Sequence, residues 1–189
     1  QVEYFDFYLF HNVCEMNIDE YLNEDHGIME YLWKQKENGR IKHLGFSVHG
    51  SFDVARRFLE KEGIFIRHTF MLWCQGETDG DHHMTAGDYQ SYFMQMWERM
   101  KMEGVERCFL IRIGRYNGAE KISYEDIRQA QEALAQKIPE VVMVSRKFAE
   151  MKARGLMKDE FHYYQQAYNE VGIQAGENTA EYIRMESGL

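Results

Sequence analysis

Proline and basic residues are scarce in this sequence. The 189 residues include a single proline, Pro139, so no proline-rich linker divides the chain, and we expect one compact domain. Lysine and arginine number 22 against 31 aspartates and glutamates, which gives a formal net charge of −9. A nucleic-acid surface needs clustered Lys and Arg, so we expect no nucleic-acid partner. No apolar run reaches the roughly eighteen residues of a membrane span, and no signal peptide is visible, so we expect a cytoplasmic protein without membrane contact.

Metal-binding and disulfide patterns are lacking as well. The cysteines are odd in number and have no metal-ligand spacing: Cys14, Cys74 and Cys108. We expect reduced thiols. Four histidines in expected loops form no convincing ligand pattern either: His11, His49, His82 and His83. The sequence therefore predicts neither a metal nor a cofactor. Because the chain begins at Gln1 without a methionine, truncation and processing both stay open.

Strand-like and helix-like segments alternate along the chain. Apolar and aromatic runs predict strands at 4–10, 41–46, 64–74, 107–113 and 141–145. Helical spacing predicts helices at 27–38, 52–62, 85–103, 124–137, 147–154 and 165–184, with a break in the last near Gly172 or Gly176. Ser51, Thr85 and Ser123 are the expected N-caps, and residues 17–25 an acidic loop. Such alternation builds a parallel sheet covered by helices. We predict a single α/β domain over 1–189, a three-layer α/β/α sandwich with a mostly parallel sheet of about five strands.

The sequence contains two polar clusters, one directly after a predicted strand and one shortly before the predicted C-terminal helix. The first, Trp73-Cys74-Gln75-Gly76-Glu77-Thr78-Asp79, comes directly after an apolar run, and the second is Asp159-Glu160-Phe161-His162. Because open α/β sheets bind ligands at the carboxyl ends of their strands, we expect the two clusters to face each other. Glu77 and Asp79 read either as paired carboxylates or as structural groups in loop hydrogen bonds or ion pairs. Arg112 and Arg115 are the expected ion-pair partners.

Residues 66–185 resemble the sialate O-acetylesterase-like branch of the SGNH hydrolases. The resemblance rests on the first cluster, on Ile127-Arg128-Gln129-Ala130-Gln131, and on the second cluster followed by Tyr168-Asn169-Glu170-Val171-Gly172. It implies an SGNH- or flavodoxin-like sandwich and a carbohydrate or small-molecule acyl ester as substrate. It also implies that His162 is a general base, that Asp159 orients it and that Gln75 helps to bind the oxyanion. Three neighbours in the first cluster are then expected to line the substrate site: Gly76, Glu77 and Asp79.

Residues 2–62 resemble a different family, the aldo-keto reductases. Phe5-Asp6-Phe7-Tyr8-Leu9-Phe10-His11 is similar to the strand that ends in that family's active-site histidine, and Gly39 to Ser47 is similar to the next strand. The resemblance implies that His11 contacts substrate and that Ser47 contacts a nicotinamide. It covers two of eight β-α units, and the catalytic Tyr, Lys and Asp are absent. We therefore divide the domain into a reductase-like part, 1–63, and an esterase-like part, 64–189.

The serine nucleophile of the esterase family is missing from its usual place. That family carries it in a Gly-x-Ser block upstream of the first cluster, where this chain has the reductase-like part. Ser47, Ser51 or Cys14 could substitute, since each follows a predicted strand. The alternative is that Ser51 only caps a helix and Ser47 is a loop hydroxyl. We therefore expect an SGNH-type carbohydrate O-acetylesterase-like protein that is inactive if nothing replaces the block. A non-catalytic folded chimera and an NADPH-dependent reductase fragment are the alternatives, and the oligomeric state is open.

Overall fold

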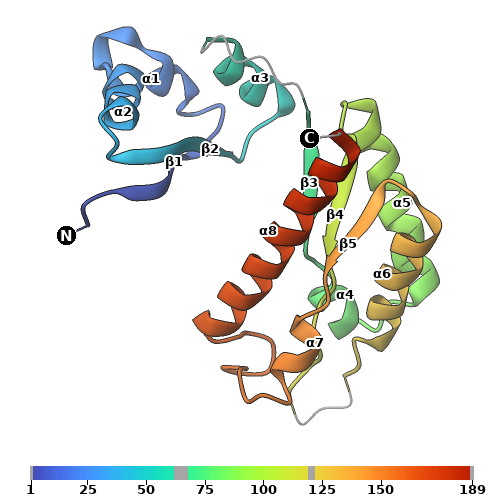
Figure 1. Cartoon of the computed structure of the whole chain (residues 1–189). Helices are drawn as coiled ribbons and strands as arrows, with labels where there is room; N and C mark the ends of the chain where they lie inside the picture. The colour runs from blue at the N-terminus through green and yellow to red at the C-terminus, as the bar shows by residue number, and fades with distance from the viewer. Residues whose placement is uncertain (1, 62–67, 119–121, 188–189) are drawn as a thin grey trace. The chain divides into compact units, whose positions relative to one another are not determined.

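The computed structural model describes residues 2–61, 68–118 and 122–187. The chain divides into two compact units, residues 1–67 and residues 68–189, which Figure 1 colours blue to teal and green to red. Each unit has a parallel sheet of its own among the described residues, β1-β2 in the first and β3-β4-β5 in the second. The prediction of one sheet of about five strands is therefore wrong in this respect, because the five strands are split. That the units act as one domain stays a prediction, and the join expected near residue 63 falls outside the described residues.

The first unit is a two-stranded parallel sheet with three helices. Strands β1 (Phe5–Val13) and β2 (Ile41–Val48) pair with Phe5 opposite Ile41 and Val13 opposite Val48. They are joined through α1 (Ile18–Leu22), the short 3-10 turn η1 (Glu24–His26) and α2 (Ile28–Glu37), and α3 (Phe52–Lys61) follows β2. The core of this unit consists of Phe10, Val13, Ile18, Leu32, Ile41, Val54 and Phe58. Residues 17–25 were expected to be a loop; they form α1 and η1, because Ile18 anchors them to this core.

Part of β1 leaves large apolar side chains facing water. Phe7 is 73% exposed, Leu9 50% and Phe5 40%. These three residues alternate along the strand, so they share one face of the sheet. Parallel sheets normally have both faces covered. In the first unit Phe10 of the same strand belongs to the core, whereas Phe5, Phe7 and Leu9 do not.

The second unit is a three-layer α/β/α sandwich. Its strands β3 (Phe70–Trp73), β4 (Arg107–Ile111) and β5 (Val141–Ser145) are parallel, with β4 in the middle. Helices α5 (Ala86–Met102) and α6 (Glu125–Lys137) cover one face, and α7 (Phe148–Met151) and α8 (Gln165–Ser187) cover the other (Figure 1). Along β4, Cys108 and Leu110 pack toward α5 and α6, whereas Phe109 and Ile111 pack toward α7 and α8. The predicted α/β class with parallel strands is confirmed.

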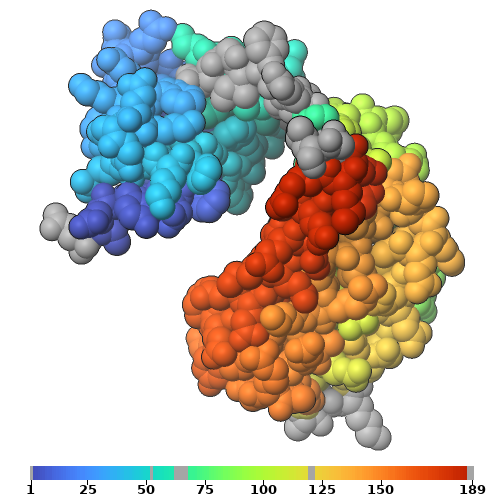
Figure 2. All heavy atoms as spheres, in the orientation of Figure 1, coloured from blue at the N-terminus to red at the C-terminus, as the bar shows by residue number. Residues whose placement is uncertain are grey.

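Helix ends follow the sequence signals only in part. Thr85 caps α5 as expected, because its Oγ accepts the N–H of Asp88 at 3.1 Å. At α6 the N-cap residue is Tyr124, and Ser123 lies one position too early, where its Oγ accepts the N–H of Glu125. Helix α8 runs without a break through Gly172 and forms a continuous outer surface of this unit (Figure 2). None of the described helices is long and apolar enough to cross a membrane.

Candidate functional site

A glycine turns the chain sharply at the end of β3. Gly76 has φ of +142°, a conformation that residues with a Cβ rarely adopt. A Cβ at this position would lie 2.6 Å from Cγ2 of Ile127 on α6, so glycine also allows the close approach of the two segments. The chain then enters the short helix α4 (Glu77–Asp81). The turn therefore presents Glu77 and the residues after it at the carboxyl end of the sheet.

One buried glutamine fixes this turn to the rest of the unit. Gln131 on α6 is fully buried, and its Oε1 accepts the N–H of Ile113 at 3.0 Å. Its Nε2 donates to the carbonyl of Gln75 at 2.8 Å and to the hydroxyl of Tyr89 at 3.1 Å. The Tyr89 hydroxyl in turn donates to the carbonyl of Gln75 at 2.9 Å. Sequence reasoning assigned Gln131 no role, although an amide four residues after Ile127, on the apolar face of a helix, is a signal for a buried hydrogen bond.

The side chain of Gln75 does not share a cavity with His162. Its Nε2 donates to Oδ2 of Asp79 at 2.6 Å. Both side chains line a largely apolar cavity of about 400 Å³, together with Trp73 and residues of α5. Of the alternatives for Asp79, this contact matches a local hydrogen bond, whereas the Arg112 guanidinium donates to Glu132 at 2.6 Å. The oxyanion role of Gln75 stays a prediction, and it requires the carboxamide to turn away from Asp79.

Asp159 and His162 form a tight pair in the loop before α8. Oδ1 of Asp159 accepts the backbone N–H groups of Phe161 at 3.0 Å and His162 at 2.7 Å. Nδ1 of the His162 ring lies 2.9 Å from Oδ2 and 3.0 Å from Oδ1 of the same carboxylate. The backbone N–H groups, followed by the ring, lower the pKa of Asp159 to about 2. The carboxylate is therefore ionised at neutral pH, and it favours the tautomer in which Nε2 of His162 accepts a proton.

His162 of this pair lines a cavity to which both polar clusters contribute residues. This cavity has a volume of about 440 Å³. Phe161 and His162 line it from the second cluster, and it is also lined by the following Tyr163, by Tyr168 of α8 and by Phe148 of α7. Its remaining lining residues follow β3: Cys74, Glu77, Thr78 and Asp81. The expectation that the two clusters face each other is thus met, with Glu77 in the cavity and Gly76 and Asp79 shaping the turn beside it.

The hydrogen-bond partner of the His162 ring is the Asp159 carboxylate. Among the residues that the structure describes, no hydroxyl or thiol hydrogen-bonds to the His162 ring. Cys74 is exposed and is the cysteine among the residues that line this cavity. Desolvation, followed by the charge of Glu77, raises the pKa of the Cys74 thiol to about 12. The thiol is therefore protonated at neutral pH, and it is a poor nucleophile in that form.

The other candidate nucleophiles belong to the first unit. The Ser47 hydroxyl at the end of β2 accepts the N–H of Asn12 at 2.9 Å and lies 3.4 Å from Nδ1 of His11. Ser51 directly precedes α3, and its N–H donates to the Glu15 carboxylate at 2.8 Å. Cys14 is buried. The structure therefore brings His11 and Ser47 together within the first unit, whereas the Asp159–His162 pair belongs to the second.

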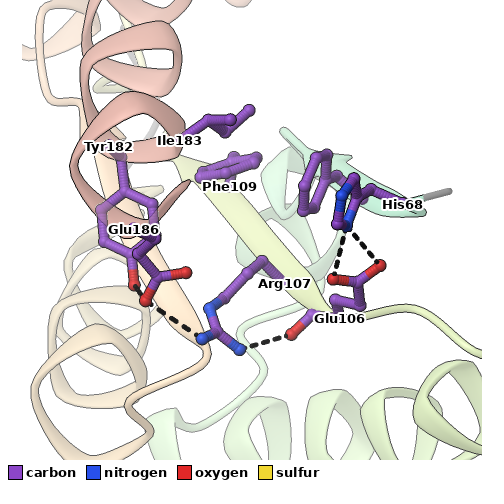
Figure 3. A pocket seen from close by; sticks show the side chains of 8 residues that line it. His68, Glu106, Arg107, Phe109, Tyr182, Ile183 and Glu186 are labelled. Carbon is purple, nitrogen blue, oxygen red and sulfur yellow. Dashed lines mark hydrogen bonds and ion pairs between the residues drawn. The ribbon is translucent and has the colours of Figure 1, made fainter. Parts of the chain in front are cut away.

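A different cavity lies at the opposite end of the second sheet, at the amino ends of β3 and β4 (Figure 3). Its volume is about 430 Å³, and Phe109, Tyr182 and Ile183 form its apolar wall. Its polar side chains are paired: His68 with Glu106 at 3.1 Å, and Arg107 with Glu186 at 3.1 Å. Because ligands of open α/β sheets bind at the carboxyl ends of the strands, we place the candidate site in the cavity of His162. Over residues 2–61, 68–118 and 122–187, no group of three or more His, Cys, Asp or Glu could hold a metal ion.

A three-layer α/β unit with a histidine–carboxylate pair at the carboxyl end of its sheet is typical of esterase-like hydrolases. In agreement, the family model described as "Carbohydrate esterase, sialic acid-specific acetylesterase" matches residues 53–181, more than half of the chain. The chain belongs to this family, and the predicted esterase resemblance is confirmed. The match begins within α3, earlier than the boundary at 64. Searches of curated proteins and of solved structures found no match. The reductase resemblance of residues 2–62 stays a prediction.

Proposed function

We propose that the protein acts as an SGNH-type carbohydrate O-acetylesterase in which His162 is the general base and Asp159 orients it. One observation carries the proposal. The Asp159 carboxylate lies 2.9 Å from Nδ1 of His162, and the ring faces a cavity that the residues after β3 also line. A histidine held in this way keeps Nε2 available as a proton acceptor, and the carboxylate stabilises the imidazolium that forms.

In the proposed reaction, a hydroxyl group or a water molecule attacks the acetyl carbonyl. His162 accepts the proton of the attacking group at Nε2 and returns it to the sugar oxygen that leaves. With water as the attacking group the acetyl group is released as acetate; with a protein hydroxyl it forms an ester, which water then hydrolyses to acetate with His162 again accepting the proton. Asp159 stays ionised throughout, because its pKa is about 2. Glu77 and Asp81 line the same cavity, where they can accept hydrogen bonds from sugar hydroxyl groups.

The attacking group determines how fast the reaction runs. If Ser47, Ser51 or Cys14 is the nucleophile, the attacking group belongs to the first unit. Without a covalent nucleophile, His162 can activate only water, and we expect a general-base rate enhancement of roughly 10²- to 10⁴-fold, not that of a complete triad. Mass spectrometry of the protein after exposure to an activated acetyl ester separates the two routes. An adduct on one of the three residues supports the covalent route, and its absence on all of them supports water.

Hydrolysis of p-nitrophenyl acetate by the full chain tests the general base. We expect His162→Ala to reduce the rate at least tenfold and Asp159→Asn to reduce it similarly, since the amide no longer favours the productive tautomer. His82→Ala is the matched control, because His82 is an exposed histidine of the same unit at the end of α4. A rate unchanged by His162→Ala would remove the proposed base.

A further inference from the structure

A small cavity with an excess of positive charge lies at the start of α6. Its volume is about 150 Å³. Three cationic side chains line it, Arg115, Arg128 and Lys152, against one carboxylate, that of Glu125. The chain as a whole carries a net charge of −9, so this grouping runs against its overall composition. Like charges repel, so three cations in one small cavity favour the binding of an anion.

Arg128 provides the strongest reason to expect a ligand. The residue is 4% exposed, and its Nη1 donates to the Glu125 carboxylate at 2.7 Å. Its Nε is buried and has no hydrogen-bond partner in the part of the chain that the structure describes. Burial, followed by the charge of Arg112, lowers the pKa of the Arg128 guanidinium. A buried cation with an unused donor is stabilised by a further acceptor nearby.

The other lining groups can also bind an anion. Arg115 is exposed and makes no ion pair with any described residue. Lys152 donates one hydrogen bond, to the carbonyl of Tyr116 at 2.9 Å, and an ammonium group has three donors. The amino end of the 13-residue helix α6, which carries partial positive charge, also borders the cavity; its Glu125 N–H donates to the Ser123 hydroxyl at 3.2 Å.

This cavity is separated from that of His162 by aromatic side chains. The Tyr124 hydroxyl donates to Asp81 at 2.8 Å, and Asp81 lines the larger cavity. The Tyr116 ring, which lines the small cavity, lies 5.9 Å from the ring of Phe161, which lines the large one. An anion held here would therefore lie next to the candidate active site.

We propose that the small cavity binds a compact oxyanion, that is, a carboxylate, phosphate or sulfate group, through Arg115, Arg128 and Lys152. The anion can be free in solution, or it can be a charged substituent of a bound substrate. Only the second source rests on the proposed esterase function. The experiment therefore measures anion binding and ester hydrolysis separately.

The first measurement is a titration of the full chain with inorganic phosphate, followed by the ¹H–¹⁵N signals of the arginine Nε–H groups. We expect a saturable shift of the Arg128 signal that is weakened at least tenfold by Arg115→Gln, because one of three cations is lost. Lys137→Gln is the matched control, since it removes one exposed positive charge from the far end of the same helix. No saturable shift, or equal weakening by both variants, would overturn the proposal.

The second measurement distinguishes the source of the anion. KM is compared for p-nitrophenyl acetate, which is neutral, and for an acetylated sugar acid. A rise in KM by Arg115→Gln for the sugar acid alone assigns the anion to the substrate. Phosphate binding without such a rise assigns it to a free anion. If neither ester is hydrolysed, the proposed esterase function fails, while the phosphate titration still decides whether the cavity binds an anion.

Discussion

Replacing Gln131 by leucine should destabilise the second unit by about 3 kcal/mol. Leucine has a similar volume but offers no hydrogen bond. The buried N–H of Ile113 then loses its acceptor, which costs about 1–3 kcal/mol. The two hydrogen bonds that Nε2 donates contribute about 1 kcal/mol each. Because the Gln75 carbonyl keeps the Tyr89 hydroxyl as a donor, part of the loss at that carbonyl is offset. A change of this size shifts the ratio of folded to unfolded protein by roughly 100-fold.

Urea unfolding measures this change. A Trp33→Phe background removes the tryptophan of the first unit, so the fluorescence of Trp73 and Trp97 reports on the second unit. Gln129→Leu is the matched control, because Gln129 is exposed on the same helix and should alter stability by less than about 0.5 kcal/mol. If Gln131→Leu lowers the unfolding free energy no more than Gln129→Leu does, the hydrogen-bond network does not hold the turn after β3.

Two further predictions concern the same turn. Gly76→Ala should destabilise the protein by about 2–5 kcal/mol in urea unfolding, because the alanine Cβ would meet Ile127 in a disfavoured backbone conformation. Gly172→Ala on α8, where a Cβ meets nothing within 4 Å, should be neutral or stabilising, and equal effects would contradict the argument. Alkylation of Cys74 by iodoacetamide, measured by peptide mass spectrometry, should rise about tenfold per pH unit from about pH 7 to about pH 10, because the raised pKa of about 12 keeps the thiol protonated. A plateau in that range would refute the assigned pKa.

The elements of the second unit were largely predictable from the sequence. The strands Arg107–Ile111 and Val141–Ser145 contain the apolar runs 108–111 and 141–144, because both of their faces are covered by helices. Thr85 marked the start of α5 correctly, since a hydroxyl before an apolar stripe satisfies a first-turn N–H. The break expected in α8 does not occur, because packing of Val171 and Ala175, which are 2% and 4% exposed, outweighs the low helix propensity of the two glycines.

Tertiary features were beyond the sequence signals. A strand-like sequence pattern indicates that a segment forms a strand, but it does not identify the neighbouring strand. The pattern therefore could not show that the five strands are divided between two sheets. The orientation of the Gln75 carboxamide depends on Asp79 four residues later, a contact set by the fold of α4. The Asp159–His162 pair was predictable, because a spacing of three residues in a turn brings the two side chains together. The basic cavity around Arg128 is lined by residues from the loop after β4, from α6 and from the segment after α7. No local sequence pattern predicts it.

Helix α8 extends from one end of the second sheet to the other. Twenty-three residues without a break make a stiff rod about 35 Å long. Its first residue follows His162 by three positions, and its last turns supply Tyr182 and Ile183 to the cavity at the opposite end. The histidine loop and the apolar wall of the far cavity are therefore joined by one uninterrupted helix.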